Sequence, residues 1–98
     1  MNKPLILSNE EILARLPEIP GWSYLNQKLT KEFKFKTFMD VIKFINELAP
    51  FCEEINHHPD MHIYYNKIVF ELQCLDVGGK VTDKDFAVAK EIEKNHQK

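Results

Sequence analysis

The sequence predicts an α+β fold, a two-layer sandwich in which three helices pack on one face of a four-stranded antiparallel sheet (αββαββα). Apolar residues recur every three or four positions in three segments, which is typical of amphipathic helices. They recur at every second position in four others, which is typical of strands with one buried face. Short turns join these strands in pairs, so all of the helices are expected to cover the same apolar face.

The length and charge of the chain limit its class. At 98 residues it is expected to form one domain, 1-98, small enough for self-association to add stability. The formal net charge is -2 and acidic and basic residues are interspersed, which argues against a nucleic-acid partner. No apolar run approaches the ~20 residues of a membrane span, and residues 1–7 lack the apolar core of a signal peptide. Because Cys52 and Cys74 both fall on apolar faces, we expect reduced thiols and a cytoplasmic protein.

The first half of the chain is expected to form a helix, a hairpin and a second helix. Residues 8–11 form a capping box that begins a short helix, and residues 26–27 form the turn of a hairpin. A long amphipathic helix is expected from Phe38 to Ile55, ending at about His57. Pro50 removes an amide donor inside this helix, which predicts a kink or a break into two helices.

The second half is expected to form another hairpin and a last helix. A two-residue turn at residues 66–67 predicts these strand pairs: Tyr65 with Ile68, Ile63 with Phe70, and Met61 with Leu72. On the other face it pairs His62 with Glu71. Thr82 is expected to cap the last helix, while residues 95–98, His96 included, are expected to fray into solvent.

Three of the four histidines fall within residues 53–65. His57 and His58 are adjacent, where the long helix gives way to a strand. The negative end of the helix dipole favours a protonated imidazole there, and histidine titrates near neutral pH. The two residues are therefore candidates for acid/base catalysis, and the alternative is a polar helix terminus without a chemical role.

The spacing around these histidines resembles the signature of the pterin-4a-carbinolamine dehydratases. The matching residues are Glu53, His57, His58, Pro59 and Tyr65, with Asp85 at the expected distance downstream. The resemblance extends to residues 21–22, 33–38, 65–67 and 82–86, so it covers nearly the whole chain. It implies the same αββαββα fold that the periodicity predicts.

The resemblance also implies an activity, the dehydration of 4a-hydroxytetrahydrobiopterin to quinonoid dihydropterin in tetrahydrobiopterin recycling. It implies no metal, no organic cofactor, and a homo-oligomer, either a dimer or a tetramer. His57 and His58 would be catalytic, since groups that titrate near neutral pH serve as acid and base. The residues that it implies at the substrate are Glu53, Pro59, Trp22, Asp85, Cys74 and Leu75.

One position departs from the family pattern. The family places a third active-site histidine ten residues after the aromatic residue that Tyr65 matches, and this chain has Leu75 there. Leucine does not transfer protons. A second function therefore stays open, that of a dehydratase-like binding or assembly protein that is catalytically weak or inactive.

Several of these residues also have purely structural interpretations. Glu53 is consistent with an exposed helix charge, Asp85 with a cap completed for Thr82, and Trp22 with a core residue. A metal site would draw on His57, His58, His62, Asp60 and Cys52. It is disfavoured because adjacent side chains on an extended chain point in opposite directions and no HExxH-like spacing is present.

Overall fold

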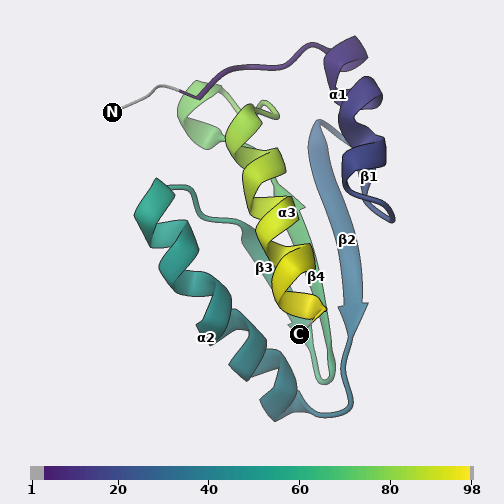
Figure 1. The fold of residues 1–98 in the computed structure, drawn as a ribbon, viewed down its shortest axis with the longest axis vertical. Helices are drawn as coiled ribbons and strands as arrows, with labels where there is room; N and C mark the ends of the chain where they lie inside the picture. Colours follow the sequence, from purple (N-terminus) through teal and green to yellow (C-terminus); the bar gives the residue numbers. More distant parts are fainter. Residues whose placement is uncertain (1–3, 98) are drawn as a thin grey trace.

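The computed structural model describes residues 4–97. The α-helices are α1 (Asn9–Arg15), α2 (Phe38–Ile55) and α3 (Asp83–His96), and the strands are β1 (Ser23–Leu25), β2 (Lys28–Lys34), β3 (Asp60–Tyr64) and β4 (Lys67–Leu72). Two 3-10 helices, η1 (Leu16–Glu18) and η2 (Leu75–Val77), follow α1 and β4. The predicted order of helices and strands is confirmed (Figure 1).

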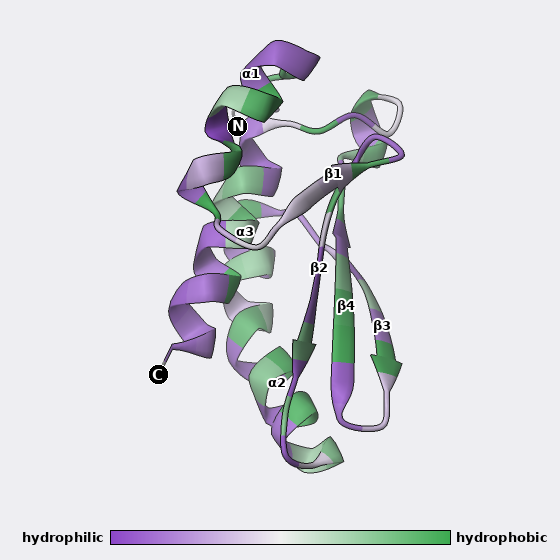
Figure 2. Cartoon of the chain, turned by 90° about the vertical axis from the view of Figure 1, so that its right-hand side faces the viewer, coloured by the Kyte–Doolittle hydropathy of each residue, from purple (hydrophilic) through white to green (hydrophobic). Residues whose placement is uncertain are grey.

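The strands form one antiparallel sheet in the order β1-β2-β4-β3, and the three α-helices lie on one side of it (Figure 2). The predicted α+β two-layer architecture is confirmed. The core between the layers contains side chains from both: Leu29, Ile68, Phe70, Leu72, Leu48, Phe86 and Ile92. Burial of each large apolar side chain contributes about 1.5–3 kcal/mol, so the contact between layers holds the elements in place. No helix within residues 4–97 is long and apolar enough to cross a membrane.

Short-range sequence features set the ends of these elements. The predicted capping box is present at α1, where the Ser8 hydroxyl accepts from the Glu11 amide and the Glu11 carboxylate accepts from the Ser8 amide. Asn26 and Gln27 adopt the left-handed φ values of 52° and 63° that a tight hairpin turn requires. Asn56 ends α2 in the same region, with φ 53°. Asparagine tolerates this conformation, so the chain leaves α2 at once and turns toward β3.

The predicted bounds of the long helix, Phe38 to Ile55, are confirmed for α2. The helix is continuous through Pro50, so the predicted break into two helices is wrong, and the kink predicted as its alternative stays a prediction. Packing explains the continuity, because Val41, Phe44, Leu48 and Cys52 are buried on one face on both sides of the proline. The free energy of this burial outweighs the loss of one helical hydrogen bond.

The pairing of β3 with β4 also differs from its prediction. The turn consists of Tyr65 and Asn66, and Ile63 lies opposite Ile68 and not Phe70. Tyr65 takes a left-handed φ of 53°, which is unfavourable for a large aromatic residue and was not foreseen. His62 is therefore paired with Val69 in the ladder, yet its imidazole Nε2 reaches Glu71 Oε1 at 3.2 Å. The predicted side-chain contact is present without the predicted register.

The C-terminal residues do not fray as predicted. Helix α3 continues to His96, and Asn95 is buried, whereas His96 is exposed as predicted. The His96 ring packs against the rings of Phe33 and Phe44, with centroid distances of 4.7 Å and 6.0 Å. Aromatic contacts of this kind contribute about 0.5–1.5 kcal/mol each, which holds the last turn of α3 on the protein. Of the predicted tail, Lys98 lies outside the described residues.

Candidate active site

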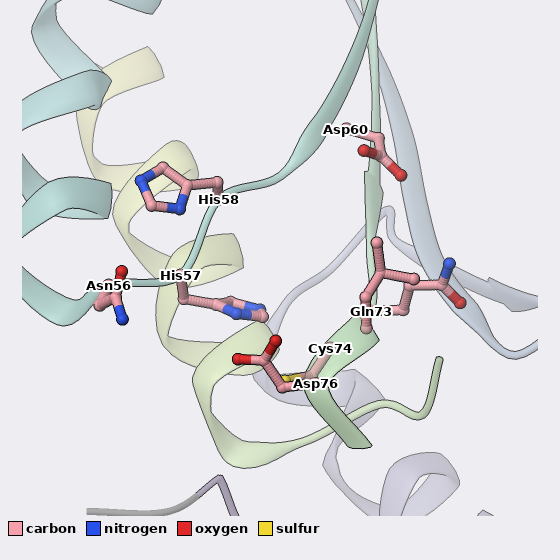
Figure 3. A pocket seen from close by; sticks show the side chains of 8 residues that line it. Asn56, His57, His58, Asp60, Gln73, Cys74 and Asp76 are labelled. Carbon is pink, nitrogen blue, oxygen red and sulfur yellow. The ribbon is translucent and has the colours of Figure 1, made fainter. Parts of the chain in front are cut away.

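A pocket of about 380 Å³ lies where the segment after α2 faces the segment after β4 (Figure 3). Its lining residues are Asn56, His57, His58, Asp60, Gln73, Cys74, Leu75 and Asp76. The first four follow α2 or begin β3, and the last four follow β4. Because β3 and β4 are antiparallel neighbours, the start of one lies beside the end of the other, which brings these two segments together.

His57 is the buried histidine of this pocket. The left-handed turn at Asn56 directs the chain away from α2, and the His57 amide still donates to the carbonyl oxygen of Cys52 at 3.0 Å. Its imidazole Nε2 lies 2.5 Å from Asp85 Oδ1. The two side chains are 7% and 0% exposed, so this polar contact is shielded from water. In Figure 3 the His57 ring points toward Asp76 across the pocket.

Asp85 has two partners, one for each carboxylate oxygen. Oδ2 accepts from the Thr82 amide at 2.8 Å and from the Thr82 hydroxyl at 3.2 Å, which caps α3. Oδ1 faces His57. The predicted cap is therefore confirmed for Asp85, and its other oxygen contacts the pocket residue His57, while its role at a substrate stays a prediction. One carboxylate fixes the first turn of α3 and orients the imidazole.

The contact with Asp85 assigns the two nitrogens of His57. With the carboxylate as acceptor, Nε2 carries a proton, and in the neutral ring Nδ1 then carries the lone pair. A buried carboxylate that orients an imidazole in this way fixes its tautomer and its direction. Nδ1 is therefore the ring nitrogen left for a ligand, and it is able to accept a proton from it.

His58 is oriented differently. Figure 3 shows its ring pointing back toward α2, whereas the ring of His57 points into the pocket. Its Nε2 contacts Glu53 Oε2, five residues earlier in the chain. These two side chains are 54% and 75% exposed. Successive residues on an extended segment point to opposite sides, so one histidine is enclosed and the other faces solvent.

The opposite wall is built by the segment after β4. Cys74 is buried, and its carbonyl oxygen accepts from the amides of Val77 and Gly79 at 3.3 Å and 3.0 Å. This turn requires the left-handed φ of 81° at Gly78. Leu75 projects from it and is 72% exposed. An apolar side chain thus lines a largely polar pocket.

A family model described as "Pterin 4 alpha carbinolamine dehydratase" matches residues 6–95. The chain belongs to this family. A "Putative pterin-4-alpha-carbinolamine dehydratase" from Sulfolobus acidocaldarius is 50% identical over 88 residues, which cover 90% of this chain and 96% of the relative. A protein of the same printed name from Mycolicibacterium smegmatis is 40% identical over 87 residues, 89% of this chain and 92% of the relative.

Two solved structures share the fold of this dehydratase-family chain. A transcriptional coactivator/pterin dehydratase from Brucella melitensis superposes with a TM-score of 0.86 at 27% identity, covering 92% of this chain and 97% of that one. A pterin dehydratase-like protein identified as a RuBisCO assembly factor in the alpha-carboxysome gives a TM-score of 0.59 at 20% identity, with 76% and 84% covered. The second likeness is one of fold alone.

Trp22 does not line this pocket of the dehydratase-family chain. It is 6% exposed and packs in the core, with its ring centroid 6.2 Å from that of Phe33 and 6.5 Å from that of Phe70. Its indole Nε1 donates to Glu93 Oε2 at 2.9 Å. The expectation that it forms a pocket wall is therefore not met, because a carboxylate of α3 satisfies the indole inside the core. Pro59 lines a neighbouring hollow and not this pocket.

Three pocket residues were missed in the sequence, Asn56, Gln73 and Asp76, and Asp60 was considered only as a possible metal ligand. Asp60 directly follows the histidines and proline, so its place in the chain was sufficient to find it. Gln73 and Asp76 required the strand order, because only the pairing of β3 with β4 brings them opposite His57. Within residues 4–97 no three His, Cys, Asp or Glu side chains are placed to hold a metal ion.

Proposed function

We propose that this chain dehydrates 4a-hydroxytetrahydropterins, with 4a-hydroxytetrahydrobiopterin as the reference substrate, in the recycling of tetrahydrobiopterin. The observation that carries the proposal is the buried His57–Asp85 pair, because its imidazole lines a pocket of about 380 Å³. Sites for small ligands typically have volumes of about 300–1,000 Å³. Membership of the dehydratase family supports the same reaction class.

The reaction removes one molecule of water. The C4a–O bond breaks and its electron pair leaves with the oxygen, which takes a proton. The N5–H bond also breaks, and its electron pair forms the C4a=N5 double bond of the quinonoid product. The substrate thus needs one proton acceptor and one proton donor, and no oxidant or reductant.

We assign the acceptor role to His57 and the donor role to His58. Asp85 holds Nε2 of the pocket residue His57, which leaves Nδ1 to accept the N5 proton, and Asp85 stabilises the resulting imidazolium. Glu53 orients His58 on the adjoining wall. A well-placed acid or base of this kind contributes about 10²–10⁴-fold to the rate.

The other pocket residues suit the polar edge of a pterin ring. That edge carries an amino group and a ring N–H, which donate hydrogen bonds. Asp60, Gln73 and Asp76 supply side-chain acceptors around the pocket. They support binding of the aminopyrimidinone ring with its reacting C4a–N5 bond toward the histidines.

A second candidate function is that of a binding or assembly protein that has lost most of its catalysis. The observation that favours it is Leu75, an exposed apolar side chain at the position of a family histidine. The RuBisCO assembly factor shares only the fold, so the likeness does not indicate RuBisCO as a partner of this chain.

The dehydration assay decides between the two candidates. Purified protein is mixed with freshly prepared 4a-hydroxytetrahydropterin, and quinonoid dihydropterin is followed by absorbance. We expect acceleration over the spontaneous rate, abolished in His57→Ala and retained in His62→Ala, which removes an exposed imidazole outside the pocket. A wild-type rate equal to the spontaneous rate would remove the claim of catalysis.

We further propose that the chain forms a cytoplasmic homo-oligomer, a dimer or a tetramer. β3 is an edge strand of the sheet, and its Met61 and Ile63 side chains are each 40% exposed. Open edges of this kind pair readily with a second chain. The two buried free thiols, Cys52 and Cys74, suit a reducing compartment. A sedimentation mass of one chain at micromolar concentration would contradict the oligomer.

A further inference from the structure

Lys84 lies in the first turn of α3, where its own helix disfavours it. The amino-terminal end of a helix carries a partial positive charge, which favours acidic residues such as the neighbouring Asp83 and Asp85 and disfavours a lysine. Within residues 4–97 the Lys84 ammonium forms no ion pair with a carboxylate. The place of this lysine is therefore explained by a contact outside α3.

The Lys84 side chain reaches the carboxyl end of α2. Its Nζ donates to the carbonyl oxygen of Ile55, the last residue of that helix, at 3.2 Å. Figure 1 shows α2 and α3 running in opposite directions, so the end of one helix lies near the start of the other. The last carbonyl groups of a helix lack partners within it and carry a partial negative charge, which attracts a cation. The last turn of α2 has no basic residue of its own, and Lys84 supplies one from α3.

Two adjacent residues of α3 thus hold the junction that carries the histidines. Lys84 contacts the backbone at Ile55, and Asp85 contacts the imidazole of His57, two residues later. Between them Asn56 takes a left-handed conformation, which turns the chain away from α2. Asp85 holds the ring at one atom, Nε2, whereas Lys84 fixes where the end of α2 stands relative to α3. Together they place both the ring and the backbone that carries it.

We infer that Lys84 is a positioning residue for His57, and that its ammonium keeps the imidazole in the direction and the tautomer that the site requires. Its effect on the reaction rate rests on the proposed function, whereas the state of the imidazole is measurable without turnover. Without the ammonium, the end of α2 is free to shift relative to α3 and to carry the His57 backbone with it. The contact with Asp85 then weakens, and the proton is shared between Nε2 and Nδ1.

The alternative is a helix cap that has no effect on the site. Loss of Lys84 would then lower the stability of the protein and leave the ring of His57 unchanged. A matched control must therefore remove a lysine contact of α3 away from the junction. Lys90 provides it, because it lies on the same helix and its Nζ is 2.8 Å from Glu18 Oε1.

The test uses Lys84→Met, which keeps the hydrocarbon stem of the side chain and removes the ammonium. Nitrogen NMR of the imidazoles, at a pH where the ring is neutral, distinguishes a protonated from an unprotonated ring nitrogen by its chemical shift. We expect Nε2 of His57 to be the protonated nitrogen in the wild type. In Lys84→Met the two nitrogen shifts should move toward their average, and in Lys90→Met they should stay as in the wild type.

The dehydration assay gives the second measurement. A displacement of about 1 Å near a reacting centre costs roughly 10²-fold in rate, and the loss of one contact of two should displace His57 by less. We expect kcat to fall about tenfold in Lys84→Met with KM nearly unchanged. Lys90→Met should keep the wild-type kcat. Lys84→Arg keeps a long cationic donor and should restore most of the rate.

Lys84→Gln covers the event that Lys84→Met does not fold, because it stays polar at this half-buried position while it is shorter and uncharged. Unchanged His57 signals in the variant that folds overturn the inference, even where the wild type dehydrates the pterin rapidly. Changed signals that Lys84→Arg restores support it, even where the wild type shows no dehydration. An equal change in Lys90→Met overturns it, because any weakening of α3 then affects the ring. Where the wild type is active, an unchanged kcat in Lys84→Met overturns it as well.

Discussion

Asp85 Oδ1 lies 2.5 Å from His57 Nε2, although the two residues are 28 positions apart. The contact joins the segment after α2 to the first turn of α3. The same carboxylate accepts two hydrogen bonds from Thr82 through its other oxygen. The orientation of the imidazole and the start of α3 therefore depend on one side chain, so changes at Asp85 affect stability and chemistry together.

Two substitutions separate these roles. Asp85→Asn places an amide donor where an acceptor is needed, and we expect a loss of about 1–3 kcal/mol in the free energy of unfolding together with a strong fall in kcat. Thr82→Val removes one hydroxyl donor and leaves His57 with its partner. It should cost about 1 kcal/mol and keep kcat near the wild-type value.

Urea unfolding measures the first quantity, and the dehydration assay measures the second. An equal fall of kcat in Asp85→Asn and Thr82→Val would show that Asp85 acts only through the stability of α3. It would also remove the orienting role that the contact with His57 indicates.

Much of the fold could be predicted because short-range features determine it. The cap at Ser8, the left-handed residues Asn26 and Asn56, and the period of apolar residues each act within a few positions. The sequence shows such features directly. The contact between His57 and Asp85 could be expected only from the resemblance to a family, because no local sequence pattern relates residues so far apart.

The features that could not be predicted depend on distant contacts. The hairpin register places Tyr65 at φ 53°. A tyrosine does not favour this conformation locally, and the pairing of β3 with β4 imposes it. Trp22 suits a pocket wall and a core equally well, and only the hydrogen bond to Glu93, 71 positions away, places it in the core. His96 is at the chain end, yet the aromatic rings beside it hold it in place.

Pro50 should weaken α2, and its replacement should strengthen the protein. Alanine at position 50 restores the amide that donates to the carbonyl oxygen of Asn46, and it is a better helix former. We expect Pro50→Ala to raise the free energy of unfolding by about 1–3 kcal/mol, measured by urea denaturation. Pro17→Ala is the control, because Pro17 lies in the first turn of η1, where proline is tolerated. An unchanged free energy of unfolding in Pro50→Ala would contradict the expectation and would mean that the proline stabilises α2 in another way.

Glu71 should make stability depend on pH in the acid range. Hydrogen bonds from His62 and then from Lys28 hold the pKa of this carboxyl below its ordinary value of 4.5. A lowered pKa means that the stabilisation is fully present above pH 4.5 and is lost as the pH falls below it. Glu71→Gln should therefore be less stable than the wild type at pH 7, and the difference should close in acid.

Urea midpoints measured from pH 7 down to pH 3 test this expectation. Glu54→Gln is the control, because Glu54 is an exposed carboxylate of α2 that forms no ion pair with the other residues in 4–97. A constant difference between wild type and Glu71→Gln over this range would contradict the role of the carboxylate charge.

Leu75→His decides how much the missing family histidine matters. The proposed proton transfers belong to His57 and His58, and the side chain at position 75 is 72% exposed, so we expect kcat to change less than about tenfold. Leu75→Gln is the matched control, because it adds polarity without a titrating group. A rise of about 10²–10⁴-fold in Leu75→His alone would show that the natural chain lacks one member of its acid/base set. The binding or assembly function would then be the better assignment. A pocket that becomes catalytic through one substitution still has the shape to bind a ligand, but the natural chain lacks a group needed for the reaction.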